Sequence, residues 1–554
     1  MSMRLPGEPY FLPAERRDTV DSRNNMADEL GRGLLRRRGL RLRLFFGGII
    51  SGLAAGLAVA AYRFLIGETE GLRASLAAAV SASGLLLPYA LWAGFLMALA
   101  GALVLLGRWE PAARGSGIPH VKGVLLGCLR MRWARVLAAQ IFGGALAIGA
   151  GLSLGHAGPA VQIGAAAAEG TSRAAGFRRL EERCLITGGA GAGLAAVFNA
   201  PLAGMLFAVE ELHRHFSAAV LLPAMAASVS AAALIRFLFG DATIFHFTGI
   251  RPLSADHLPY VLLLAAVCGA AALPFNYGIL HADRLFPRAL RQNAFARLAL
   301  PLAAAGLLTF LCPALTGGGD GLINALTLSA PAFPVLALLL CGKALFTFLS
   351  FGSGAPGGFF FPSLTVGALT GAAAGSLLIA AGLLPPEAMT NMIILSMAAF
   401  FSASVRAPIT GTVLLLELTG DFQHLLPLAV ASAAAYAVSG LLGGRPVYGE
   451  LLRLRMAGKS GASPAYGPGR IAELAVSAGC PLDGRAVKDL PLPPRTAPAE
   501  LLREGEYFVP DRDTVLRPGD LLYVVTQHAD PEPFLRLQQP SLPEKKLRKN
   551  FMEK

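Results

Sequence analysis

A succession of apolar segments, from about Leu40 to Leu452, is the feature that most constrains the fold of this chain. A helix needs ~20 mostly apolar residues to cross a bilayer, and segments such as 44–66, 85–106 and 258–280 reach that length. Only 15% of the 554 residues are charged and the mean hydropathy is +0.56, which is too apolar for a soluble protein of this size. Long continuous runs predict helices rather than barrel strands. The sequence therefore predicts an all-α polytopic membrane protein.

The basic residues that give the net charge of +13 gather in flanking segments. They lie before the first apolar segment and in the tail, at Arg32, Arg36, Arg37, Arg38, Arg41, Arg43, Lys545, Lys546, Arg548 and Lys549. This positive-inside pattern predicts cytoplasmic termini in the inner membrane of a prokaryote, and no nucleic-acid partner. The six cysteines have no ligand spacing, so we expect neither a disulfide framework nor a metal site, and no cofactor.

An internal repeat runs through the apolar part. Residues 199–204 (Asn-Ala-Pro-Leu-Ala-Gly) lead to Glu210 and resemble residues 406–411 (Arg-Ala-Pro-Ile-Thr-Gly), which lead to Glu417. Upstream, three residues of one copy match three of the other: Gly155, Pro159 and Gly164 match Gly358, Pro362 and Gly367. Short Gly- and Pro-interrupted segments, such as 118–128, 159–170, 201–211 and 408–420, lie in both copies. Paired broken segments predict two inverted halves with a binding site between them.

The predicted organisation has five parts. An N-terminal cytosolic segment (1–39) precedes a transmembrane domain (40–458), whose inverted halves cover roughly 40–240 and 250–458. A linker rich in Gly, Ser, Ala and Pro (459–470), a small domain (471–530) and a basic tail (531–554) follow. The small domain alternates polar and apolar residues between turn signals, which predicts strands plus a helix in a cytosolic α+β domain.

Three stretches share one design: 115–119 (Gly-Ser-Gly-Ile-Pro), 155–159 (Gly-His-Ala-Gly-Pro) and 354–362 (Gly-Ala-Pro-Gly-Gly-Phe-Phe-Phe-Pro). In each, glycines open the backbone, a proline marks a first helical turn, and an apolar helix follows. A helix N-terminus offers unpaired N–H groups and about half a positive charge, which together bind an anion. Partial charges can hold a permeant anion without trapping it. These stretches predict a site for a small anion.

The same stretches, together with residues 198–204, resemble the signature motifs of the CLC chloride channels and Cl⁻/H⁺ antiporters, in order from about Leu40 to Leu454. The resemblance implies a homodimer with one chloride pathway per subunit, across the lipid bilayer, and helices of one half inverted relative to the other. It assigns chloride coordination to the hydroxyls of Ser116 and Tyr448 and to backbone N–H groups at Gly117, Ile118, Phe359 and Phe360. A serine at 116 favours chloride over nitrate or fluoride within that family.

The informative departure from the family pattern is Ala157, within the stretch His156, Ala157, Gly158 and Pro159. Family antiporters and most of its channels carry a gating glutamate at this position. An alanine neither ionises nor occupies the place of an anion, so a titratable group of the proton relay is missing. His156 replaces a basic residue, and its side chain titrates near neutral pH in water, so we weigh a pH-sensitive role against simple solvation.

Four other positions bear on proton coupling or on the charge near the pathway. Glu211 matches the intracellular glutamate that many antiporters use for proton entry, and we interpret it as retained without a partner. Its alternative interpretation is a charged helix end. His120 and Lys122 lie where antiporters carry acidic residues, and Gln140 replaces a buried lysine, which lowers the positive charge near the pathway.

The segments 481–490 and 513–520 resemble the RCK_C/TrkA-C regulatory domain of potassium-channel subunits. That resemblance implies a small cytosolic ligand, and a domain that only stabilises a dimer is the alternative.

We therefore expect a passive chloride conductance, uncoupled or weakly coupled to protons. The alternatives are a Cl⁻/H⁺ antiporter with an atypical proton route and, more distantly, a sodium-coupled inverted-repeat transporter. An enzyme is not expected, because Glu210 and Glu417 occupy equivalent repeat positions that a packing or snorkelling role explains.

Overall fold

The computed structural model describes residues 15–83, 86–127, 129–213, 218–240, 245, 247, 253, 255–457, 470–476, 479–494, 496–503, 506–526 and 537. It describes their side chains from 42 onwards, except at 83, 179–180, 218–219, 255, 457, 470–473, 475, 499, 506–508 and 525. The chain separates into two units, residues 44–461 and residues 1–43 with 462–554. The predicted linker, except Arg470, and the basic tail, except Leu537, lie outside the described residues.

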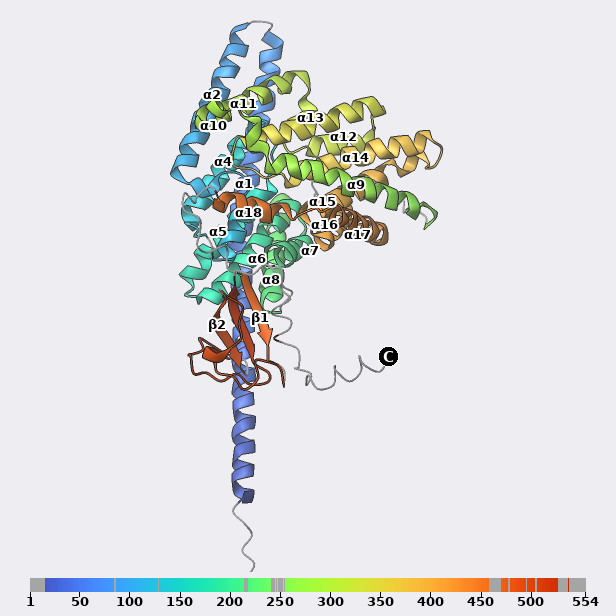
Figure 1. Ribbon diagram of the computed structural model, residues 1–554. Coiled ribbons are helices and arrows are strands. Elements are labelled where there is room, and N and C mark those ends of the chain that lie inside the picture. Colours follow the sequence, from blue (N-terminus) through green and yellow to red (C-terminus); the bar gives the residue numbers. More distant parts are fainter. Residues whose placement is uncertain are drawn as a thin grey trace, which may run out of the picture. The chain divides into compact units, whose positions relative to one another are not determined.

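The membrane unit is helical, as the sequence predicts (Figure 1). Its first half contains α1 (Glu15–Ser83, which begins in the other unit), α2 (Leu86–Trp109), α3 (Gly117–Leu125), α4 (Trp133–Gly149), α5 (Ala157–Ala174), α6 (Arg179–Phe198), α7 (Pro201–Phe207), the π-helical η2 (Ala208–His213) and α8 (Ala218–Phe239). The second half contains α9 (Leu258–Leu280), α10 (Arg288–Gln292), α11 (Ala294–Leu311), α12 (Asp320–Leu328), α13 (Phe333–Gly352), α14 (Phe360–Ala380), α15 (Met389–Val405), α16 (Pro408–Thr419), α17 (Leu425–Leu441) and α18 (Val447–Ala457).

Nine helical stretches among the described residues are long and apolar enough to cross a bilayer, so the protein is an integral multi-pass membrane protein. Other helices are too short to span it, including α3 with 9 residues and α7 with 7. Two predicted segments are longer than the sequence suggested. The segment from Pro159 belongs to α5, which has 18 residues. The apolar run ending at Ile66 continues as α1 to Ser83, because glutamates such as Glu68 and Glu70 are good helix formers and no proline stops it.

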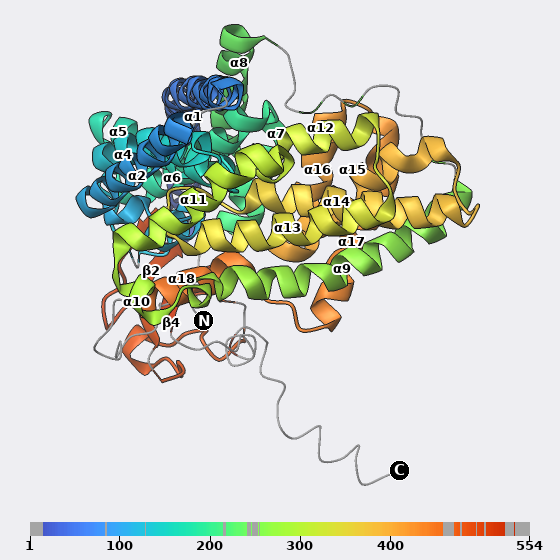
Figure 2. The ribbon, with the colours of Figure 1, turned by 90° about the horizontal axis from the view of Figure 1, so that it is seen from above.

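The two halves show the predicted repeat in their backbone geometry. Asn199 and Arg406 hold equivalent repeat positions, and they are the only non-glycine residues with positive φ in the described chain, at 56° and 70°. Each ends a helix, α6 or α15, and its N–H bonds to the carbonyl four residues before it. Figure 2 shows α4, α5 and α6 on one side of this unit and α14, α15, α16 and α17 on the other.

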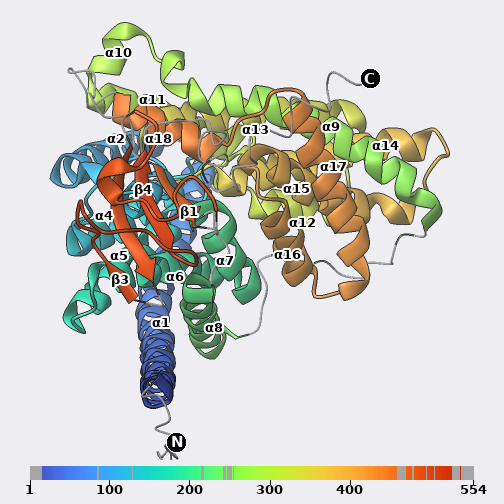
Figure 3. The same ribbon diagram turned by 60° about the horizontal axis from the view of Figure 1, so that its bottom comes forward.

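The second unit contains an antiparallel sheet with the order β1-β4-β2-β3. Its strands are β1 (Arg470–Ala475), β2 (Thr496–Arg503), β3 (Glu506–Phe508) and β4 (Leu521–Thr526), and Figure 3 shows β1 beside β4. Leucines on one face, including Leu474, Leu501 and Leu522, are fully buried and form a small core. The helical part within the described residues 470–526 is a single 3-10 turn, η8 (Val487–Asp489).

Candidate functional site

Three glycine loops meet at the centre of the membrane unit, and backbone hydrogen bonds join them. Gly115 donates its N–H to the carbonyl of Gly354 (3.2 Å) and accepts from the N–H of Gly357 (3.3 Å). Gly155 and Gly358, which are equivalent residues of the two repeats, exchange both N–H···O bonds at 2.6 and 2.9 Å. The loops that precede α3, α5 and α14 are therefore held together as one backbone structure.

Glycine is needed where these loops approach one another. A Cβ at Gly158 would lie 3.1 Å from the Cα of Gly358 and 3.1 Å from the Oγ of Ser116. A Cβ at Gly117 would lie 2.7 Å from the carbonyl oxygen of Gly158. The starts of α3 and α5 thus touch, and each helix begins without a carboxylate in its first turn.

Ser116 and Tyr448 are buried hydroxyls without a hydrogen-bond partner among the described residues. Ser116 is the N-cap residue of α3 and is 4% exposed, yet its side chain makes no capping bond. Tyr448 is fully buried, and its ring packs on Phe359 with centroids 5.0 Å apart. Buried polar groups are almost always paired in folded proteins, so two unpaired hydroxyls indicate room for a ligand that accepts hydrogen bonds.

The backbone donors predicted from the sequence lie at the same helix starts. Gly117 and Ile118 open α3, while Phe359 is the N-cap residue of α14 and Phe360 its first residue. All four are buried. N–H groups in the first turn of a helix have no intrahelical acceptor, and the helix dipole adds positive potential there.

Ala157 is the first residue of α5, and its methyl group is fully buried. The N-cap residue His156 makes no capping bond, and its ring lies against Phe361 with centroids 4.5 Å apart. Gly158 and Pro159 complete the buried first turn. The start of α5 therefore presents backbone N–H groups and no acidic side chain toward the place where α3 begins.

Glu211 has a buried ion-pair partner that the sequence did not reveal, whereas its lack of a proton-relay partner stays a prediction. Lys122 of α3 donates from Nζ to the Oε1 of Glu211 in η2 at 2.5 Å. Their side chains are 6% and 2% exposed, so the ion pair is buried. Breaking such a pair by removing one partner typically costs about 3–5 kcal/mol. The pair couples the helix that carries Ser116 to η2.

Gln140 belongs to a buried amide network that the sequence did not reveal. Its Nε2 donates to the carbonyl of Ala113 (3.1 Å) and to the Oε1 of Gln162 (2.5 Å). Gln162 in turn donates to the carbonyl of Ala112 (3.2 Å), and its Nε2 lies 2.9 Å from the Nδ1 of His120. The network packs beside α3 without a formal charge at Gln140. The signal that the sequence offered was Gln162 itself, a single polar residue within the apolar start of α5.

Two other helix starts are occupied by carboxylates. Glu417 of α16 accepts the N–H groups of Leu202 and Ala203 in the first turn of α7, at 3.0 and 2.8 Å. The sequence favoured packing or snorkelling for this residue and did not reveal the cap.

The equivalent residue Glu210, in η2, caps α16. It accepts the N–H groups of Ile409 (3.1 Å) and Thr410 (2.7 Å), and also the hydroxyl of Thr410 (2.7 Å). Each half of the molecule thus supplies the acid that closes a helix start of the other half.

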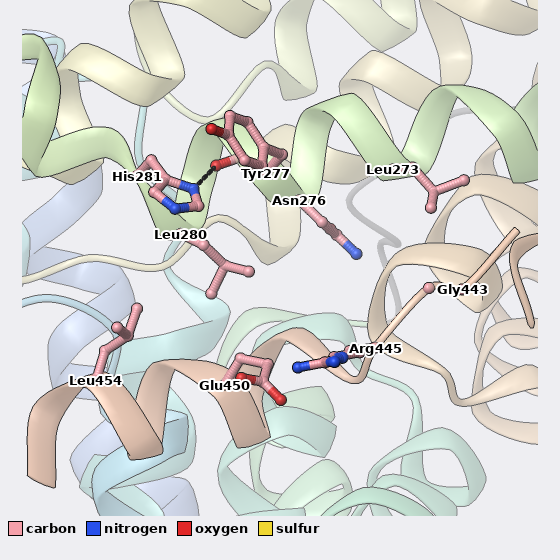
Figure 4. A pocket seen from close by; sticks show the side chains of 10 residues that line it. Leu273, Asn276, Tyr277, Leu280, His281, Gly443, Arg445, Glu450 and Leu454 are labelled. Carbon is pink, nitrogen blue, oxygen red and sulfur yellow. Dashed lines mark hydrogen bonds between the residues drawn. The ribbon is translucent and has the colours of Figure 1, made fainter. Parts of the chain in front are cut away.

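A pocket of about 330 Å³ lies away from these helix starts, between the end of α9 and the beginning of α18. Figure 4 shows Arg445 and Glu450 on one wall, with Leu280 and His281 on the other. Tyr448 does not line it, although Arg445 is three residues before it. Among the described residues, no three His, Cys, Asp or Glu side chains gather as metal ligands.

Comparison with known proteins gives two family matches. Residues 93–440 match the family described as "Voltage gated chloride channel". Residues 471–536 match the TrkA-C domain. The first match covers most of the membrane unit, including the three glycine loops.

Curated relatives and solved structures agree with the first match. A protein of Vibrio cholerae named "H(+)/Cl(-) exchange transporter ClcA" is 38% identical over 361 residues, which are 63% of this chain and 76% of the relative. A Salmonella paratyphi A protein of the same name is 34% identical over 437 residues, which are 77% of this chain and 91% of the relative. The crystal structure of a slow cyanobacterial Cl⁻/H⁺ antiporter matches with a TM-score of 0.69 and 33% identity, over 75% of this chain and 99% of that one.

Proposed function

The chain belongs to the voltage gated chloride channel family, and from that premise we propose that it is a passive chloride conductance, uncoupled or only weakly coupled to protons. Chloride transport follows from the family. The observation that carries the finer proposal is Ala157, a fully buried methyl group at the start of α5. No group at this position can take up a proton or compete with the anion.

The chloride site of this proposal lies where α3, α5 and α14 begin. Ser116 and Tyr448 would each donate one hydrogen bond from a hydroxyl that is otherwise unpaired in the described chain. The backbone N–H groups at Gly117, Ile118, Phe359 and Phe360 would add partial charge without a buried cation. An anion held only by such donors can leave again, as conduction requires.

The state of Glu211 supports the uncoupled mechanism. Its carboxylate is held in a buried ion pair with Lys122, so using it to carry protons would require that pair to break. Together, Ala157 and the ion pair leave neither of the two family proton positions free to exchange a proton.

Proton-coupled exchange is the second candidate, because the curated relatives are named as exchangers. It would require a proton route that bypasses residue 157. The sodium-coupled alternative and an enzymatic role do not fit a chain of this transporter family.

A liposome experiment separates the first two mechanisms. The full-length protein is reconstituted, and the reversal potential is measured under a chloride gradient with and without a pH gradient. We expect the potential to follow the chloride gradient alone, within a small leak. A potential that moves with pH, or uphill proton movement driven by chloride, would contradict the proposal and establish exchange. Protein-free liposomes and a coupled exchanger are the controls.

We further propose that the protein is a homodimer and that residues 471–530 form a regulatory domain for a small cytosolic ligand. The TrkA-C match supports the second part. Light scattering of the solubilised full-length protein tests the dimer. Deleting residues 459–554 should change the flux or its response to cytosolic solutes, and an unchanged flux under all conditions would favour a purely stabilising domain.

A further inference from the structure

Four aromatic rings form a cluster that includes the residue before Ala157. The cluster consists of His156, Phe198, Phe245 and Phe361. Phe198 and Phe361 stack with parallel planes at a centroid distance of 5.4 Å. His156 lies 4.5 Å and Phe245 lies 5.6 Å from the Phe361 ring. Phe361 is therefore the centre of the cluster, which brings together four segments far apart in the sequence.

The cluster adjoins the proposed chloride site through the backbone. His156 is the N-cap residue of α5, and Phe361 directly follows Phe360, which opens α14. The contact is tight, because a Cβ at Gly155 would lie 2.6 Å from the Cβ of Phe361. The Phe198 ring lies 5.4 Å from Phe360 as well as from Phe361. The rings thus border two of the three helix starts.

The three phenylalanine rings of the cluster oppose the passage of an anion, whereas His156 beside them keeps a ring N–H that can donate. The rings of Phe198, Phe245 and Phe361 are at most 1% exposed. They offer no N–H or O–H donor to replace the water that a chloride ion must shed. Constrictions lined by apolar side chains close ion pathways by excluding water. A carboxylate at the family position would close the pathway with its negative charge, whereas these rings would close it by excluding water.

We propose that this aromatic cluster is the barrier that limits chloride flux in this protein, and that the ring of Phe361 sets its height. The inference rests on the proposed conductance, because a pathway without a carboxylate at residue 157 still needs a barrier. Chloride passes when the Phe361 ring moves aside and water enters between α5 and α14.

The test compares two cavity-forming variants of the full-length protein in liposomes. Phe361→Ala removes the central ring, whereas Phe286→Ala removes an equally buried ring (1% exposed) outside the cluster. We expect the chloride flux of Phe361→Ala to rise about tenfold, which corresponds to a barrier lowered by about 1.4 kcal/mol. The same variant should admit larger anions such as thiocyanate more readily relative to chloride. Phe286→Ala should keep the wild-type flux and anion preference.

An unchanged flux and anion preference in Phe361→Ala would overturn the barrier, and so would an equal rise in both variants, which would indicate general loosening. If Phe361→Ala does not fold, the smaller changes Phe361→Leu and Phe361→Val should raise the flux in that order, and a flat series would overturn the inference. Proton movement is recorded in the same liposomes. Coupled protons in the wild type would contradict the conductance itself, independently of the response at Phe361.

Discussion

Two sets of helix starts lie in the same membrane unit and differ in what faces them. The starts of α7 and α16 are closed by Glu417 and Glu210, whose carboxylates accept backbone N–H groups at 2.7 to 3.1 Å. The starts of α3, α5 and α14 have no acidic residue in their first turns. Next to them lie the hydroxyls of Ser116 and Tyr448, which have no hydrogen-bond partner within the described part of the chain.

Under the proposed function, the difference means that a helix start can bind a permeant anion only where no carboxylate of the protein already fills it. All five starts have a nearby proline and the same dipole. Two of them are filled by resident carboxylates that join the halves of the repeat. At residue 157, where the family places a further carboxylate, this chain has an alanine. The proposed conductance and the capped interface are thus two uses of one local structure.

Removing the carboxylates that cap α7 and α16 should have the largest effect, which is a loss of stability. Glu210→Ala and Glu417→Ala each leave two backbone N–H groups without their acceptor. In each pair only one N–H group, that of Ala203 or of Thr410, is part-buried, and leaving such a donor without its acceptor costs about 1–3 kcal/mol, so each variant should lose about 1–3 kcal/mol of stability. Urea or thermal denaturation of the solubilised protein measures this, with Glu68→Gln, at an exposed glutamate, as the control. Unchanged stability in both variants would mean that the caps do not hold the halves together.

Placing a carboxylate at an open start should have the next largest effect. Ala157→Glu is expected to lower chloride flux at neutral pH by about tenfold or more, equivalent to about 1.4 kcal/mol, because an ionised carboxylate competes with chloride for the same N–H groups. Flux should recover at acidic pH, where the side chain is neutral. Chloride efflux from liposomes across the pH range measures this. A flux equal to that of the wild type at every pH would show that residue 157 does not face the pathway.

Removing a single hydroxyl should have a smaller effect on the open site. Ser116→Ala and Tyr448→Phe each delete one donor, which is worth about 0.5–1.5 kcal/mol, or about two- to twelvefold in chloride affinity. Calorimetric titration with chloride measures the change. Ser228→Ala is the matched control, because Ser228 is also buried with an unpaired hydroxyl but belongs to α8. Equal losses of chloride affinity in all three variants would contradict a direct role of Ser116 and Tyr448 in binding chloride.

The smallest effect is expected for a carboxylate outside the membrane. Burial raises the pKa of Asp520, but hydrogen bonds from Arg503 and from the N–H of Arg517 outweigh it and hold the pKa below its usual range. Its contribution to stability is therefore present above the unfolded-state pKa of about 3.9 and is lost as the pH falls through the folded-state value. Hydrogen exchange of β4 amides, corrected for the intrinsic exchange rate at each pH, should accelerate below about pH 4 in the wild type. In Asp520→Asn it should already be faster at neutral pH, and equal rates at neutral pH would contradict this role.

Much of the fold could be predicted from local sequence because the hydrophobic pattern dictates it. The apolar runs predicted spanning helices, and the repeat of Pro201 and Pro408 predicted two related halves. Helix ends were less predictable, as the continuation of α1 to Ser83 shows, since glutamates in a helix do not mark its end. The partner of Glu211 was missed because Lys122 is 89 residues away in the chain, and no local pattern pairs them.

The sequence by itself determined the helix starts, the membrane environment and the absence of a carboxylate at residue 157, because propensity, hydropathy and side-chain chemistry are local properties. Tertiary structure alone decided which starts stay open. Glu210 and Glu417 read as equivalent helix-end residues in the chain, and only folding brings each to the opposite half, where it fills a helix start. The same folding gathers His156, Phe198 and Phe245 around Phe361. Contacts between distant segments depend on how the whole chain packs, and no short stretch of sequence specifies that packing.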